Sequence, residues 1–123
     1  MGKTQILRIR SGVLRLSQVL GSPVVSSIGQ PLGKIEDCVL DHFQDRVSFA
    51  ILSLDDFLGV SNKLFAVPLP ALSVRAEGGF ILHVEPETLK RATGFERNHW
   101  PDLTDRNWGE EIYSHYGYLS HWH

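Results

Sequence analysis

The chain of 123 residues has the length of one domain, and its hydrophobic and charged fractions, 42% and 21%, are those of an ordinary globular protein. Its formal net charge of −2 excludes a protein that binds nucleic acid through its overall charge. No apolar run approaches the ~18 residues that a membrane-spanning helix needs, so we expect no membrane span.

The first segment, residues 1–15, is basic. It contains Lys3, Arg8, Arg10 and Arg15 and no acidic residue. Arg8 and Arg10 also interrupt the apolar stretch that could form the core of a secretory signal, so we expect no such signal. Two interpretations of this segment remain open: a solvated terminus, or a contact with an anionic surface such as RNA or lipid head groups.

Between residues 16 and 95, short apolar runs alternate with glycine and proline turns. The pattern predicts strands over 33–41, 46–53 and 63–68, and a hairpin formed by 73–76 and 80–84. Residues 55–62 are predicted to form a loop, and Pro86 to begin a short helical turn. The fold class indicated is all-β: a small barrel of about six strands with a short helical turn.

Two strands allow a prediction about their faces. Strand 33–41 carries polar residues on both faces, so we expect it to bend or to change its exposure part-way. In strand 46–53, Val47, Phe49 and Ile51 alternate with Ser48, Ala50 and Leu52. The first set is bulky, and we expect it to face either a barrel interior or a core on which the sheet packs.

The last segment, residues 96–123, is an aromatic C-terminal extension. It contains all three tryptophans and all three tyrosines of the chain. Because so much aromatic surface is costly to leave in water, we expect the extension to pack on the barrel or on a second subunit. From residue 85 onward four basic residues stand against seven acidic ones, which favours contact with protein over contact with nucleic acid.

Several short motifs follow one another in a distinctive order. They are GSPV at 21–24, GQPLGKIED at 29–37, VLD at 39–41, FLG at 57–59, KLFAVP at 63–68, AL at 71–72 and GF at 79–80. This order resembles the PRC-barrel domain over residues 16–95, and 96–123 is similar to the tail of stand-alone bacterial members. The family also includes the cytoplasmic domain of the photosynthetic reaction-centre H subunit and a domain of a ribosome maturation factor. The resemblance implies a docking or assembly barrel with no shared catalytic residues and no shared cofactor.

Candidate reactive groups give no catalytic arrangement. Glu36 and Asp37 are adjacent on a strand and point to opposite faces, so they cannot act together on one bond. His115, His121 and His123 lie near the end of the chain, where a metal site would lack preorganised ligands. We therefore predict no enzyme, no catalytic residue, no cofactor and no metal site.

The expected function is that of a non-enzymatic protein-interaction module that self-associates, most simply as a homodimer. Contacts are expected through the extension or the 55–60 loop, using Phe57, Leu58, Trp100, Trp108, Tyr113, Tyr116 and Trp122. The alternative is a factor in RNA metabolism or on the ribosome that contacts RNA through Lys3, Arg8, Arg10 and Arg15. Cys38 is the only cysteine, so no intrachain disulfide can form, and we expect a cytoplasmic location.

Overall fold

A computed structural model of the protein describes residues 12–59 and 62–122, and the structural statements below refer to these residues. Strands dominate the chain, with short helices between them. In chain order the elements are α2 (Leu16–Val19), β1 (Pro23–Ser26), β2 (Pro31–Asp41), β3 (Arg46–Ser53), α3 (Asp55–Leu58), β4 (Lys63–Pro68), the 3-10 turn η1 (Leu69–Ala71), β5 (Leu72–Val74), β6 (Phe80–Leu82), α4 (Pro86–Lys90), β7 (Phe95–Glu96) and α5 (Arg106–His115).

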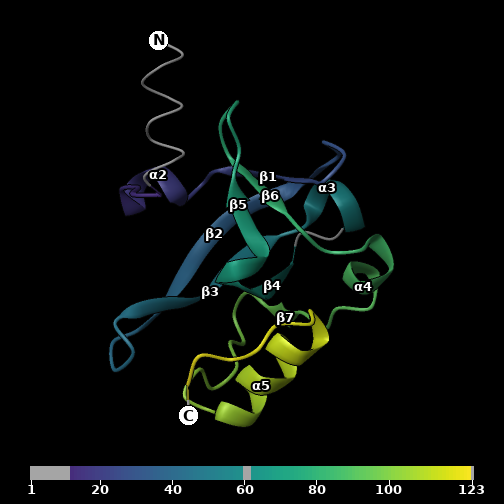
Figure 1. Ribbon diagram of the computed structural model, residues 1–123. Helices are drawn as coiled ribbons and strands as arrows, with labels where there is room; N and C mark the ends of the chain where they lie inside the picture. Colours follow the sequence, from purple (N-terminus) through teal and green to yellow (C-terminus); the bar gives the residue numbers. More distant parts are fainter. Residues whose placement is uncertain (1–11, 60–61, 123) are drawn as a thin grey trace.

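The strands form one sheet in the order β5-β6-β1-β2-β3-β4-β7, which curls into a small barrel (Figure 1). β1 and β6 pair in parallel, and every other pair of neighbours is antiparallel. The predicted all-β barrel is therefore confirmed, with seven strands in place of about six. The additional strand, β7, is only two residues long, and its sequence is too short to show an alternating pattern.

The barrel core is built from strands that are distant in the sequence. Buried side chains from five strands meet in one cluster, to which α3, α4 and the C-terminal extension add partly or fully buried residues. The strand residues of this cluster are Val24, Leu32, Ile35, Ala50, Leu52, Phe65, Val67, Phe80 and Leu82. Burial of these apolar side chains is the main stabilising term of the barrel.

Strand β3 is buried on both faces. Ala50 and Leu52 belong to the barrel core, whereas Phe49 and Ile51 belong to a second cluster outside it. Of the two predicted surroundings for this face, the barrel interior is therefore wrong for Phe49 and Ile51, and packing of the sheet on a core is the one observed. The reason is that the C-terminal extension covers the outer face of the sheet, so both faces of β3 need apolar residues. Val47 is only half-buried.

Strand β2 bends, as its two mixed faces predicted. Its register with β3 shifts between Ile35 and Asp37 and again between Val39 and Leu40. Such bulges turn a strand and change which side chains face the core. Gly33, near the start of β2, lies so close to β3 that a methyl group there would overlap the carbonyl oxygen of Ser53.

The helices differ from the predictions, since the helical turn after Pro86 was expected and α2, α3 and α5 were not. The predicted turn after Pro86 is confirmed as α4, and the predicted hairpin is confirmed as β5 and β6. Residues 55–58 form the helical turn α3, so the prediction of a loop is wrong there. Asp55 and Asp56 favour this turn because they lie at the positive end of the helix dipole, and Gly59 ends it with a φ of 70°. Helix α5 was not predicted.

Candidate functional site

The C-terminal extension forms a layer on the outer face of the sheet. Figure 1 shows α5 and the chain end together on one side of the sheet, near β4 and β7. Tyr113 and Trp122 join Phe49 and Ile51 in the outer cluster, and Trp108 is half-buried against it. The Tyr113 ring meets Phe49 edge-on with 5.3 Å between centroids, and Trp122 edge-on at 5.0 Å. This packing makes the extension part of the protein's own core.

Polar contacts fix this layer to β3. The Tyr113 hydroxyl donates a hydrogen bond of 2.7 Å to the carbonyl oxygen of Ser48, and burial raises the pKa of the phenol. His121 Nε2 lies 3.0 Å from the Ser48 hydroxyl. Burial lowers the pKa of His121, and the nearby cations of Arg46 and Arg106 lower it further, against a smaller opposing effect of Asp41.

Tyr116 lies between the extension and the barrel. It belongs to the barrel core, and burial raises the pKa of its phenol. Its hydroxyl is buried and has no hydrogen-bond partner among the described residues. Together with Tyr113 and Trp122, it is covered mainly by the chain itself, so these three predicted interaction residues pack within the protein and none of them projects from its surface.

Phe57 and Leu58 lie on α3. Both are half-buried and pack against the barrel core. They present only part of their apolar surface to the outside, because the helical turn directs them back onto the sheet.

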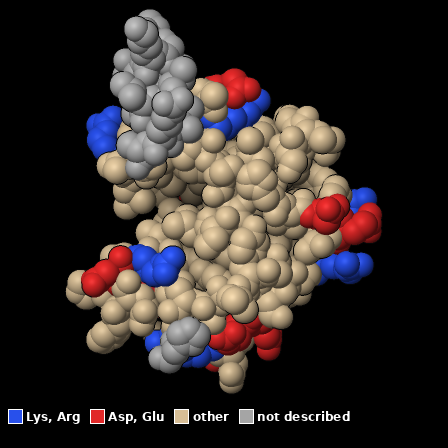
Figure 2. Space-filling model, viewed as in Figure 1, with Lys and Arg blue, Asp and Glu red and all other residues tan. Residues whose placement is uncertain are grey.

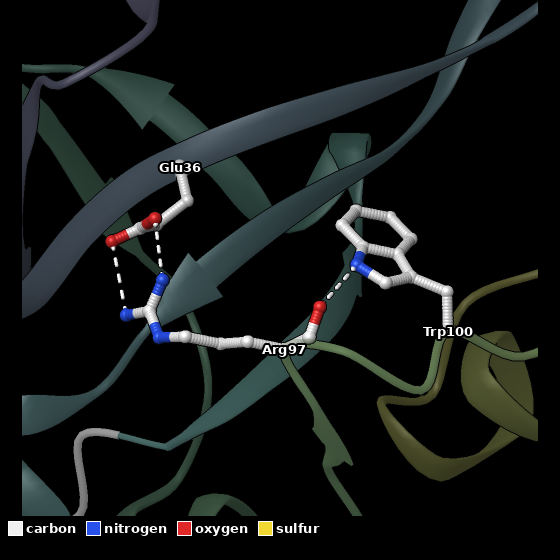
Figure 3. A network of polar contacts seen from close by, with 3 residues as sticks. All are labelled: Glu36, Arg97 and Trp100. Carbon is white, nitrogen blue, oxygen red and sulfur yellow. Dashed lines mark hydrogen bonds and ion pairs between the residues drawn. The ribbon is translucent and has the colours of Figure 1, made fainter.

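Trp100 is the predicted interaction residue that remains exposed, at 39%. Its Nε1–H donates to the carbonyl oxygen of Arg97 at 3.0 Å, and its ring stacks at a tilt on Phe95 with 5.0 Å between centroids. Arg97 in turn donates two hydrogen bonds to Glu36 in β2, of 2.8 and 3.2 Å (Figure 3). This bidentate contact lowers the pKa of the Glu36 carboxyl. The network ties the segment after β7 to β2 and holds Trp100 at the surface.

A second exposed apolar region lies at the turn between β2 and β3. Phe43 is 94% exposed and Leu40 66% exposed, and Leu103 in the segment before α5 is 39% exposed. All three line one groove between the β2–β3 hairpin and the start of α5. This region was not among the contacts predicted from the sequence. The available signal was an aromatic residue, Phe43, in the short connection between the predicted strands 33–41 and 46–53, where polar residues are usual.

The predicted anion contacts are basic residues near the start of the chain, and one of the four lies within the described residues. Lys3, Arg8 and Arg10 lie outside the described residues, and Arg15 is exposed just before α2. On the face drawn in Figure 2, positive and negative side chains are scattered, and no large patch of one sign is visible.

Two serine–histidine pairs could suggest a nucleophile and its base. Ser48 is buried beneath the extension, and His121 Nδ1 has no hydrogen-bond partner in the described part of the chain. A triad needs an acceptor at that nitrogen to orient the ring, so this pair fits an anchor better than a catalytic group. The second pair is exposed and lies between Ser73 in β5 and His83, the residue after β6, with 2.6 Å between the hydroxyl oxygen and Nε2.

The remaining reactive groups have structural surroundings. His115 contacts the carbonyl oxygen of Thr88 at 2.9 Å, and burial raises the pKa of the Cys38 thiol, which makes it a weaker nucleophile. Within residues 12–59 and 62–122, no three His, Cys, Asp or Glu side chains are grouped as metal ligands. None of the helices described has the length and apolar character of a membrane span.

Comparison with known families gives one match. The family model described as PRC-barrel domain matches residues 11–90. The matched region begins before α2 and ends at the last residue of α4, so the aromatic extension lies outside it. No curated protein matches the chain.

Proposed function

Because the chain belongs to the PRC-barrel family, whose domains are general interaction and assembly modules, we propose that it is a non-enzymatic assembly module that self-associates. The observation that carries this proposal is the exposed apolar surface that remains after the extension has packed on the barrel. Phe43, Leu40, Leu103 and Trp100 keep between 39% and 94% of their surface in contact with solvent. Apolar side chains gathered in this way are typical of a protein contact.

The packing of the extension refines where that contact would be. Tyr113, Tyr116 and Trp122 stabilise the chain itself, so we assign contact with a partner to the groove beside the hairpin and, separately, to the exposed Trp100. We keep Phe57 and Leu58, which lie on α3, only as edge residues of a second contact surface, apart from the groove. A homodimer is the simplest assembly, because a closed two-fold contact uses the same surface on both copies.

A reducing compartment such as the cytoplasm suits this proposal. Cys38 is the only cysteine in the sequence, and its thiol is half-buried in the structure. The chain therefore uses no intrachain disulfide, as is usual for proteins of reducing compartments.

Sedimentation velocity over a wide range of protein concentrations tests self-association. We expect the weight-average mass to rise from one chain toward two as concentration increases. A mass of one chain at the highest concentration would overturn the proposal that the protein self-associates.

Contact with RNA is the second candidate. It is favoured by residues 1–15, in which every charged side chain is basic. Neutralising Lys3, Arg8, Arg10 and Arg15 together should weaken binding to single-stranded RNA and reduce its dependence on salt. Each lost phosphate contact should reduce the slope of log K against log salt by about 0.7. RNA binding that the neutralised protein retains in full, or no binding by the unaltered protein at low salt, would contradict this candidate.

A further inference from the structure

From the groove beside the β2–β3 hairpin we infer that a second copy of this chain docks there, with Phe43 of each copy inserted into the groove of the other. This inference rests on the proposed self-association and identifies the surface that performs it.

The groove has a volume of about 470 Å³. One wall is the end of β2 and its turn, including Leu40, and the other runs from Leu103 to Gly109. Phe49 and Trp122 also line it, and because both are buried they form its base. Apolar clefts of this size accept large side chains from a partner.

The hairpin provides a side chain that fits such a groove. Figure 1 shows the hairpin extending away from the rest of the sheet, with its turn at the far end. Phe43 lies in that turn and is 94% exposed, so it packs on almost nothing within its own chain. Each copy therefore carries, on one surface, an aromatic ring that can insert into a partner and an apolar groove that can receive the ring of that partner.

The turn also holds Phe43 in a fixed position. The Asp41 carboxylate accepts hydrogen bonds from the backbone N–H groups of Phe43, at 3.1 Å, and Gln44, at 3.2 Å. Asp45 follows with a φ of 53°, a conformation that aspartate tolerates in turns. A turn ordered before binding loses less conformational entropy when it docks, which favours affinity.

The charges around the groove suit a second copy. The hairpin carries Asp41, Asp45 and Arg46, and the opposite wall carries Asp105 and Arg106. Figure 2 shows acidic and basic side chains next to one another at the position of the hairpin. Because both signs occur on one surface, a two-fold rotation can place acids of one copy opposite bases of the other. Three acids among five charges would weaken contact with nucleic acid.

β1 pairs with β2 only as far as Lys34, so the later part of β2 has an edge to which a partner strand could add. This is a less suitable mode of docking. The Cys38 N–H already donates to the carboxylate of Asp37 at 2.8 Å. An incoming strand would have to displace this contact, and an inward-bonded carboxylate of this kind protects a strand edge. Insertion of a side chain into the groove leaves the bond intact.

A matched pair of substitutions tests the inference. Phe43→Ser removes the inserted ring, and Leu119→Ser removes an equally exposed apolar side chain, 95% exposed, that lies outside the groove. Neither side chain is buried, so both variants should fold, which circular dichroism and thermal unfolding would verify. We expect Phe43→Ser to raise the dimer dissociation constant at least about tenfold, as for a central interface residue, and Leu119→Ser to leave it unchanged.

The outcomes separate this inference from the proposed function. A dimer that persists in Phe43→Ser, while the unaltered protein is also a dimer, would overturn the groove but leave self-association in place. If the unaltered protein is monomeric, both the proposed self-association and the docking of a second copy in the groove are wrong. The groove would then be a site for a different protein.

Cross-linking gives a second readout. One Cys38→Ser copy carries Gln44→Cys, at the exposed position beside Phe43 so that the ring is kept, and another carries Leu103→Cys. A short bis-maleimide is added to the mixture, and a product that joins Gln44→Cys of one copy to Leu103→Cys of the other is expected. Its absence from a mixture that sedimentation shows to be dimeric would overturn the inference.

Discussion

The hydroxyl of Tyr113 in α5 donates a hydrogen bond of 2.7 Å to the carbonyl oxygen of Ser48 in β3. This contact joins the C-terminal extension to β3, which lies between β2 and β4 in the sheet. It also satisfies a carbonyl group in the part of β3 that lies beyond its pairing with β4, which ends at Phe49. The extension is therefore fixed by a specific bond in addition to its apolar packing.

Tyr113→Phe should destabilise the protein by about 1–3 kcal/mol, because it leaves a buried carbonyl group without its partner. The free energy of unfolding in urea measures the loss. The ring stays in place, so the aromatic packing of the outer cluster is kept.

Tyr116→Phe is the matched control. It removes a buried hydroxyl that has no partner among the described residues, so it should leave stability unchanged or increase it. Equal losses in the two variants would contradict the specific role of the bond between Tyr113 and Ser48.

Gly109→Ala should destabilise the protein even though alanine is the better helix former. A methyl group at Gly109 would lie 2.8 Å from Cζ2 of Trp122, which packs directly on the helix there. The gain in helix propensity of about 1 kcal/mol is smaller than the usual overpacking cost of about 1–3 kcal/mol. Ser114→Ala, at an exposed position of the same helix, should be neutral or stabilising in the same denaturation experiment.

The stability of the protein should decrease as the pH falls below about 6.5, the ordinary pKa of histidine. Because the folded protein lowers the pKa of His121, the unfolded chain binds the proton first, and protonation favours unfolding. The contribution is complete above the ordinary pKa and is lost as the pH falls toward the lower pKa of the folded state.

His121→Gln removes the titrating ring and can keep a contact with Ser48. Unfolding free energies measured between neutral and mildly acidic pH should therefore fall less steeply in this variant. His42→Gln, which replaces an exposed ring, should retain the decrease of the unaltered protein. A His121→Gln profile as steep as the original would show that other groups cause the pH dependence.

Glu36→Gln should cost less than about 1 kcal/mol at neutral pH, because an ion pair that is partly exposed gains little from charge alone. The side chains of Arg97 and Glu36 keep 39% and 23% of their surface exposed. Arg97 lowers the pKa of Glu36, so the contribution is present at neutral pH and is lost as the pH falls through that lowered value. Glu87→Gln, which affects the more exposed pair with Lys90, should cost still less in the same measurement.

The strands of the barrel could be predicted because each leaves a local signal. β3 and β4 are largely apolar runs bounded by proline or charged residues, β2 follows a turn with Gly29 and Pro31, and the turn glycines Gly78 and Gly79 mark the hairpin of β5 and β6. Tertiary pairing alone decides β7, which is two residues long, so no local pattern could indicate it.

The candidate site was harder to predict for the same reason. Trp100 and Tyr113 are equally aromatic in the sequence, but one lies at the surface and the other is 1% exposed. Which aromatic residues face a partner depends on how α5 is oriented, and that orientation is set by contacts such as Gly109 with Trp122. Composition could indicate that the extension packs on the barrel or on a second subunit, but it could not indicate which aromatic rings stay exposed.

The double-sided burial of β3 makes the extension inseparable from the barrel. A shortened chain that stops after the family-matched region would lose Tyr113 and Trp122 and would expose Phe49 and Ile51 on the outer face of the sheet. Such a fragment would present an apolar sheet face to solvent and would be prone to aggregate. The last thirty or so residues therefore keep this chain soluble by covering that face.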